Sequence, residues 1–201
     1  MIKTESYIKY ATDPHFFLKE ACEMDLAVDF RFLLDSILQD RYHLIMQRRN
    51  IGMTRFLTHY AAWRLVFGLD ENILIILPTS DARRLFHKQL SIVMEPIINT
   101  ELRNKRTYRS SQNYIELGSN RVRFIVAGKH AGRGEMPSLV IMKGFGVMRD
   151  AQDIWTSISG SMSMGQSDCI ITNPWGTELG FFGEMWKSAL KGDADFTSHY
   201  I

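Results

Sequence analysis

The sequence predicts an α/β fold in which helices flank a largely parallel sheet. Short, continuous apolar runs alternate along the chain with longer segments whose apolar residues recur every three or four positions. The first pattern is typical of strands buried on both faces, and the second of amphipathic helices. Elements that alternate in this way form parallel sheets. The length of 201 residues predicts one domain, residues 1–201.

The composition excludes several classes of protein. A content of 45% hydrophobic and 23% charged residues is ordinary for a globular protein. The longest apolar run, around Ile73 to Pro78, is too short to span a membrane, and the N-terminus lacks a signal-peptide core. Cys22 and Cys169 show no metal-ligand spacing. We therefore expect an intracellular protein with no membrane partner and no metal site.

Residues 1–40 are predicted to form a helical, acidic segment ahead of a core at residues 41–201. They contain four Lys/Arg and eight Asp/Glu residues. Their apolar residues, from Phe16 to Leu26 and from Phe30 to Leu38, recur at helical spacing.

A strand, a tight turn and a helix are predicted next. Tyr42–Met46 is a short apolar strand, Gly52 marks the turn, and residues 53–67 have helical periodicity. This is the layout of a phosphate-binding loop, in which turn amides and a helix N-terminus surround phosphates. A working loop has Gly-Lys-Ser or Gly-Lys-Thr at this point. Here the triplet is Gly52-Met53-Thr54, so the shape is kept without the charge.

The remaining chain continues the alternation of strands and helices. Asn72–Leu77 is an unbroken apolar run, as expected for a central strand, and Thr79 or Ser80 is predicted to cap the following helix. The later predicted elements are the end of that helix near Ile98, a hairpin over 113–126, a basic glycine-rich loop over 128–134, a strand over 139–142, a helix over 151–158, a flexible loop over 159–167, a strand over 169–172, a helix over 178–190 and an edge strand over 196–201.

Residues 101–133 concentrate positive charge, with eight Lys/Arg residues against only Glu101 and Glu116. Such a block is either a solvated face or a footprint for nucleic-acid phosphates. The second interpretation predicts DNA affinity that falls steeply with salt and weakens in the Arg121→Ala, Arg123→Ala variant. The DNA-binding candidates are Arg103, Lys105, Arg106, Arg109, Arg121, Arg123, Lys129 and Arg133.

Six blocks follow one another in a defined order. They are the turn at Gly52, the hairpin over 113–126, Gly132-Arg133-Gly134, Val140 to Gly144, Ile171 to Gly176, and the aromatic helix Phe182 to Trp186. Together they resemble the ATPase domain of phage terminase large subunits, the motors that pump DNA into procapsids. The resemblance covers about residues 40–200 and implies a P-loop NTPase-like fold of the ASCE type with a β-hairpin insertion. In the family, this domain is followed by a nuclease domain, which we expect to be absent here.

The departures from the family pattern carry the functional prediction. The resemblance places the family's phosphate-binding lysine on Met53, its magnesium-positioning aspartate on Lys143 and its catalytic glutamate on Gly144. Loss of one stabilising group costs roughly a hundredfold to a thousandfold in rate, so loss of all three predicts no useful turnover. No catalytic residue, and no bound ATP, magnesium or other metal, is expected. The vestigial phosphate site comprises Arg48, Arg49, Gly52, Met53, Thr54 and Lys143, and the degenerate Walker B motif is Lys143-Gly144.

Three functional hypotheses remain open at this point. The first is a catalytically inactive pseudo-ATPase in phage DNA packaging in the host cytoplasm, whose partners are DNA, a competent terminase subunit or another packaging protein. The second is a weak packaging ATPase in which Arg48, Arg49, Arg55 or Lys143 supplies the missing charge. The third is a nucleic-acid-binding module without a packaging role. The sequence leaves the oligomeric state open.

Overall fold

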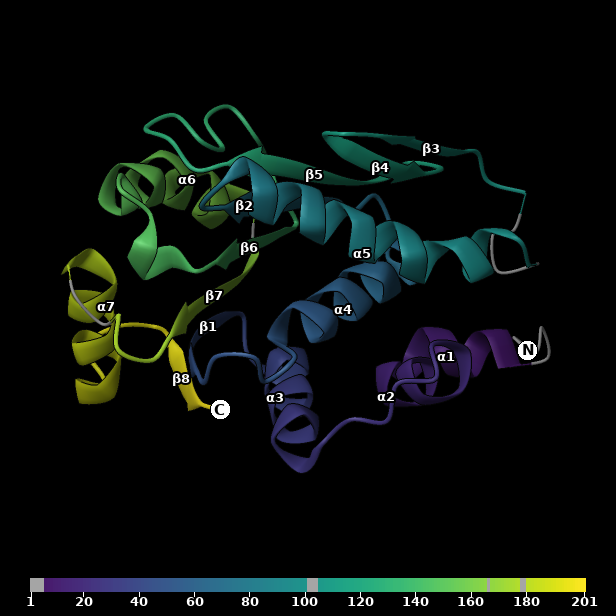
Figure 1. The fold of residues 1–201 in the computed structure, drawn as a ribbon, viewed down its shortest axis with the longest axis horizontal. Helices are drawn as coiled ribbons and strands as arrows, with labels where there is room; N and C mark the ends of the chain where they lie inside the picture. Colours follow the sequence, from purple (N-terminus) through teal and green to yellow (C-terminus); the bar gives the residue numbers. More distant parts are fainter. Residues whose placement is uncertain (1–5, 101–104, 166, 178–179) are drawn as a thin grey trace.

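A computed structural model describes residues 6–100, 105–165, 167–177 and 180–201 (Figure 1). The strands of this part of the chain form one eight-stranded sheet in the order β3-β4-β5-β2-β6-β7-β1-β8. Strands β5, β2, β6, β7, β1 and β8 run parallel, and β3 and β4 pair antiparallel. The bounds are β1 (Tyr42–Gln47), β2 (Asn72–Leu77), β3 (Tyr108–Ser111), β4 (Tyr114–Leu117), β5 (Asn120–Val126), β6 (Leu139–Lys143), β7 (Asp168–Pro174) and β8 (Thr197–Tyr200).

Helices cover both faces of the sheet, so the predicted α/β class is confirmed. The helices are α1 (Tyr7–Thr12), α2 (Pro14–Phe16), the π-helical turn η2 (Phe17–Ala21), α3 (Val28–Gln39), α4 (Met53–Phe67), α5 (Ser80–Ile98), the 3-10 turn η4 (Phe145–Val147), α6 (Ala151–Gly165) and α7 (Gly180–Lys191). One apolar core joins the sheet to α3, α4 and α5, for example through Phe30, Phe56 and Phe86. The other joins it to α6 and α7 through Ile154 and Phe182. Figure 1 shows α4 between α5 and the N-terminal helices.

Most predicted elements occur where the pattern placed them, with one clear error. Residues 159–167 were expected to form a flexible loop, but α6 continues to Gly165. The reason is burial, because Ile158 and Met162 are four residues apart on one face of the helix and both pack into the core. That burial outweighs the poor helix propensity of Gly160. The hairpin also has a third strand, β3, which the sequence did not reveal.

The N-terminal segment packs directly on α4, as its apolar spacing indicates. Tyr10 and Phe17 are buried, and the Trp63 indole on α4 donates a hydrogen bond to the Tyr10 carbonyl at 2.9 Å. Within the described residues, no helix is both long and apolar enough to cross a bilayer.

Arg64 fixes the C-terminal part of α4 to the beginnings of two strands. Its guanidinium donates to both carboxylate oxygens of Glu71, at 2.6 and 3.0 Å, and to Asp168 at 2.8 Å. Glu71 precedes β2 and Asp168 begins β7, and the Ser138 hydroxyl, just before β6, also donates to Glu71. The Arg64 and Glu71 side chains are only 15% and 8% exposed. The bidentate pair therefore holds α4 across the amino edge of the sheet.

We expect Arg64→Met to lower the free energy of unfolding by about 3 kcal/mol, because the Glu71 carboxylate is then left buried without its partner. Urea unfolding of the two proteins measures this difference. The matched control is Arg84→Met, which removes an exposed ion pair with Asp81 and is expected to cost less than about 1 kcal/mol. Equal losses in the two variants would show that the Arg64 network is not structurally important.

Two histidines join the edge strand β8 to β1. His43 Nδ1 and His199 Nε2 are 3.1 Å apart, and His43 Nε2 lies 2.9 Å from the Asp40 carbonyl oxygen. His43 Nε2–H therefore donates to that carbonyl, which leaves His43 Nδ1 to accept from His199. Burial lowers the pKa of His43, and burial together with the His43 charge lowers the pKa of His199 to about 4. The contact requires both rings to be neutral.

The free energy of unfolding is therefore expected to fall as the pH drops from about 6.5 toward about 4. Both histidines take up protons more readily in the unfolded chain, so their contribution is complete above the unfolded pKa and is lost below it. His199→Gln keeps a donor for His43 and should reduce the pH slope, although His59 and His87, whose pKa values burial also lowers, maintain part of it. Unfolding curves at about pH 7.5 and pH 5 measure the slope. A slope that is the same in His199→Gln and in the exposed-site control His130→Gln would contradict the assignment.

Candidate functional site

The candidate site lies at the carboxyl ends of the parallel strands, where ligands of open α/β sheets bind. Strand β1 leads into the turn before α4, and β6 leads into Lys143-Gly144. Strand β7 lies between β1 and β6 in the sheet. The topology thus brings both predicted motifs to one edge.

The turn after β1 has the geometry of a phosphate-binding loop. Gly52 has φ +96° and precedes the first residue of α4, and Asn50 also has positive φ. A side chain at Gly52 would meet no atom within 4 Å, so the glycine is needed for its backbone angle rather than for space. No side chain caps the N-terminus of α4. Its first amide groups are therefore available to an anion.

Met53, at the position that the resemblance assigns to the phosphate-binding lysine, is buried in the apolar core. Its side chain is 2% exposed and belongs to the core shared by α4 and the sheet. A thioether there offers no charge to a phosphate.

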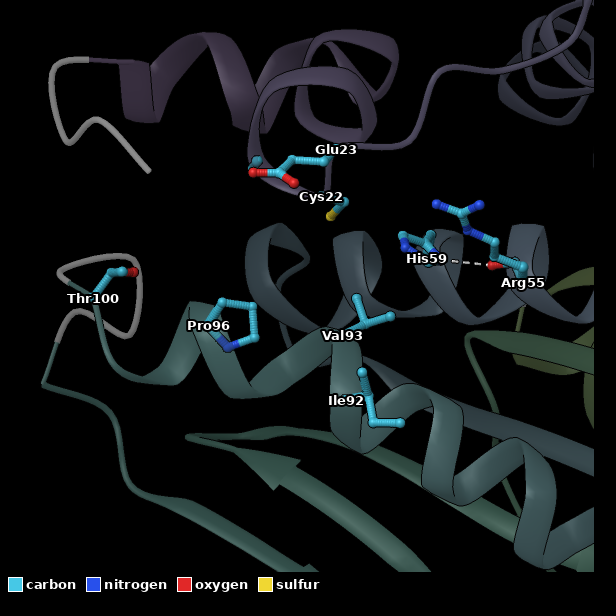
Figure 2. Close-up of a pocket in the computed structure, with 9 residues that line it drawn as sticks. Cys22, Glu23, Arg55, His59, Ile92, Val93, Pro96 and Thr100 are labelled. Atoms are coloured by element: carbon cyan, nitrogen blue, oxygen red, sulfur yellow. Dashed lines mark hydrogen bonds between the residues drawn. The ribbon is translucent and has the colours of Figure 1, made fainter. Parts of the chain in front are cut away.

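The neighbouring arginines take different positions. Arg48 lies over the Trp175 ring, with 5.5 Å from its guanidinium carbon to the ring centroid, and Trp175 is 43% exposed. Arg55 faces a cavity between α4 and the N-terminal segment, as Figure 2 shows. Arg49 is exposed in the turn itself, and Thr54 is half-buried. Of the three arginines considered as replacements for the missing lysine, Arg49 is thus the one that the turn presents to solvent.

Lys143 ends β6 with its side chain half-buried, and burial lowers its pKa. In the sheet it is paired with Thr172 of β7, whose buried hydroxyl has no hydrogen-bond partner among the described residues. The same holds for the Gln47 side-chain carbonyl at the end of β1. Strand alternation places all three residues on the α4 face of the sheet. Sequence analysis missed Gln47, although a polar residue closing an apolar strand was a visible signal.

The backbone after Lys143 favours glycine. Gly144 has φ +74°, and its N–H donates to the Thr172 carbonyl at 2.8 Å. A glutamate at this position, where the resemblance places the catalytic one, would be strained by roughly 1 kcal/mol or more.

These residues do not fit a magnesium ion. Among the described residues, no group of three or more His, Cys, Asp and Glu side chains is placed to hold a metal. The Lys143 ammonium occupies the strand end where the family pattern has a carboxylate, and it would repel a dication. The donor set of helix amides, ammonium and hydroxyl suits an anion.

Asn173 connects the ends of β6 and β7. Its Oδ1 accepts from the Gly146 amide at 2.9 Å, and its Nδ2 donates to the Thr177 carbonyl at 2.9 Å. The side chain is fully buried. It stabilises the turns on both sides of the site, in agreement with the interpretation that this motif caps a turn.

The basic segment does not form one continuous set of free cations. Arg106 donates to the Val66 carbonyl, Arg121 pairs with Glu116, and Arg123 pairs with Glu135. Lys105 and Arg109 are exposed near the hairpin, whereas Lys129 and Arg133 are exposed in the loop between β5 and β6. Figure 1 shows that loop beside α6, at the opposite end of β5 from the hairpin turn. Arg103 lies outside the described residues.

Comparison with known proteins identifies the fold. No protein-family model and no curated protein matches the chain. It is similar to the large terminase ATPase domain of Thermus phage P74-26, with a TM-score of 0.70, 15% identity, and coverage of 94% of this chain and 84% of that chain. For the HK97 bacteriophage large terminase the TM-score is 0.68 at 16% identity, with 88% and 39% covered. For the large terminase of a thermophilic bacteriophage in complex with ADP it is 0.61 at 11% identity, with 98% and 44% covered.

The chain thus spans less than half of the second and third of these terminases. Its agreement with the separately solved ATPase domain extends over most of both chains. The chain therefore has the P-loop-like fold of phage large terminase ATPase domains, as the order of its sequence blocks predicts.

Proposed function

We propose that this chain is a catalytically inactive, terminase-like pseudo-ATPase that serves phage DNA packaging as a DNA-binding or regulatory partner. The observation that carries this proposal is the cation at the end of β6. Lys143 is half-buried beside the α4 N-terminus face, at the position that the resemblance assigns to a magnesium-positioning aspartate.

Phosphoryl transfer depends on positioning and on neutralising charge with lysine, metal and arginine. Met53 supplies no charge, and the Lys143 ammonium disfavours the metal. What remains is a helix N-terminus with a nearby cation, which can attract an anion but cannot polarise a γ-phosphate through magnesium. One structural neighbour is described as a complex with ADP. For this chain we propose that the nucleotide site is vestigial.

The fold also supports the choice of partner. The structural neighbours are large terminases, so a packaging protein or a catalytically competent terminase subunit is the proposed protein partner. This step is an analogy from fold, because a shared fold does not by itself fix a shared function.

The purified chain is expected to release no phosphate from ATP and magnesium above a protein-free blank, and Arg49→Ala is expected to change nothing. A malachite-green assay measures both. Arg49 is the informative variant because it is the exposed arginine of the turn. Turnover that disappears in Arg49→Ala would instead establish the alternative of a weak ATPase with a displaced cation.

The loop over residues 128–134 is the best-presented part of the basic segment for DNA. Gly132 packs so closely that an added Cβ would lie 2.8 Å from Ile158 Cδ1, and the Ser157 hydroxyl donates to the Lys129 carbonyl at 3.1 Å. The loop is thus fixed against α6 while Lys129 and Arg133 remain exposed.

We expect DNA binding to weaken in the Lys129→Ala, Arg133→Ala variant, and the slope of log affinity against log salt to fall by about 1.8, as for two lost phosphate contacts. Fluorescence anisotropy with labelled duplex DNA at several salt concentrations measures this. The matched control is Arg121→Ala, Arg123→Ala, whose guanidinium groups are already paired with Glu116 and Glu135. Binding that is insensitive to salt, or lost only in the control variant, would reject this loop as the DNA contact.

A further inference from the structure

A cavity of about 540 Å³ lies between the N-terminal helical segment and the helices α4 and α5 (Figure 2). Its volume falls within the range typical of small-molecule sites. None of its lining residues belongs to the Gly52 turn or to the end of β6. Figure 2 shows Cys22 and Glu23 on the N-terminal segment facing Arg55 and His59 of α4, with Val93 and Pro96 of α5 completing the wall.

One end of the cavity offers a cation and a hydrogen-bond acceptor. Arg55 is exposed, and no carboxylate among the described residues lies within ion-pair distance of it. His59 is 7% exposed, and its Nδ1 lies 2.7 Å from the Arg55 carbonyl oxygen. The proton of the neutral ring is therefore on Nδ1, which leaves the Nε2 lone pair free to accept. Burial, together with the Arg55 charge, lowers the pKa of His59 and favours this neutral form.

The remaining wall is largely apolar. Val93 and Pro96 contribute hydrocarbon surface, and burial raises the pKa of the Cys22 thiol to about 12, so that it stays protonated. Glu23 lies on the N-terminal segment, away from Arg55 in Figure 2. A bound anion is therefore repelled from the Glu23 end and attracted to the Arg55 end.

We propose that this cavity binds a small organic acid with a carboxylate, a hydroxyl donor and an apolar body. The carboxylate pairs with Arg55, the hydroxyl donates to His59 Nε2, and the apolar body lies against Val93 and Pro96. Such a ligand bridges the N-terminal segment and α4. The site is independent of the nucleotide question, because it shares no residue with the Gly52 turn.

The test uses 3-hydroxybenzoate as the probe and the ¹⁵N-labelled full chain, followed by amide chemical shifts. We expect saturable shifts centred on the cavity and a loss of affinity of at least about tenfold in Arg55→Gln, as for a lost charge-assisted hydrogen bond. Arg49→Gln, an exposed arginine in the nearby turn, is the matched control and should bind normally. 3-Hydroxybenzyl alcohol, which lacks the carboxylate, and benzoate, which lacks the hydroxyl, should both bind more weakly.

A second variant tests the cavity itself. Val93→Trp is expected to fill the space and abolish the shifts while Arg55 is retained. If this variant fails to fold, the comparison of Arg55→Gln with Arg49→Gln still decides the question. The proposal is overturned by the absence of saturable shifts, by equal affinity of Arg55→Gln and the parent chain, or by shifts centred on Gly52 that Arg49→Gln removes.

Discussion

The buried pair of Arg64 and Glu71 is the interaction on which the geometry of the site depends. It holds the C-terminal part of α4 at the amino edge of the sheet, where Asp168 and Ser138 extend the network to β7 and β6. Since a helix is rigid, fixing one end also determines where the other end lies. The N-terminus of α4 is thereby held at the carboxyl edge, and the Gly52 turn meets the ends of β1 and β7 in a set arrangement.

The electrostatics of that edge explain why the two departures from the family pattern are mutually compatible. A lysine at position 53 together with Lys143 would bring two ammonium groups toward the same α4 N-terminus, which itself carries partial positive charge. Met53 avoids this repulsion by packing into the core. Lys143 then stands alone, half-buried near Thr172 and Gln47. The site has exchanged a metal-centred arrangement for a single fixed cation.

The basic segment shows how pairing changes the meaning of a charge count. Eight cations against two acids predicts one positive footprint, yet Glu135, which lies just outside the counted range, neutralises Arg123, and Glu116 neutralises Arg121. The exposed cations near the hairpin and those of the loop 128–134 are separated by the length of β5. Any DNA contact must therefore be assigned to one end or the other, because a single flat patch is absent from the described surface of this segment.

The sequence alone determined the strand-turn-helix around Gly52, the central strand Asn72–Leu77 and the order of the later blocks, because local periodicity and turn chemistry fix such features. It also identified the replacement of charged residues by Met53 and Lys143 under the family resemblance. Only the tertiary structure decided that α6 continues past Gly160, since Met162 finds a buried position that no local pattern reveals. Likewise, the cavity at Arg55 and His59, and the pairing of His43 with His199, join residues far apart in the chain. Such contacts depend on how helices pack and strands align, and composition and spacing do not encode them separately.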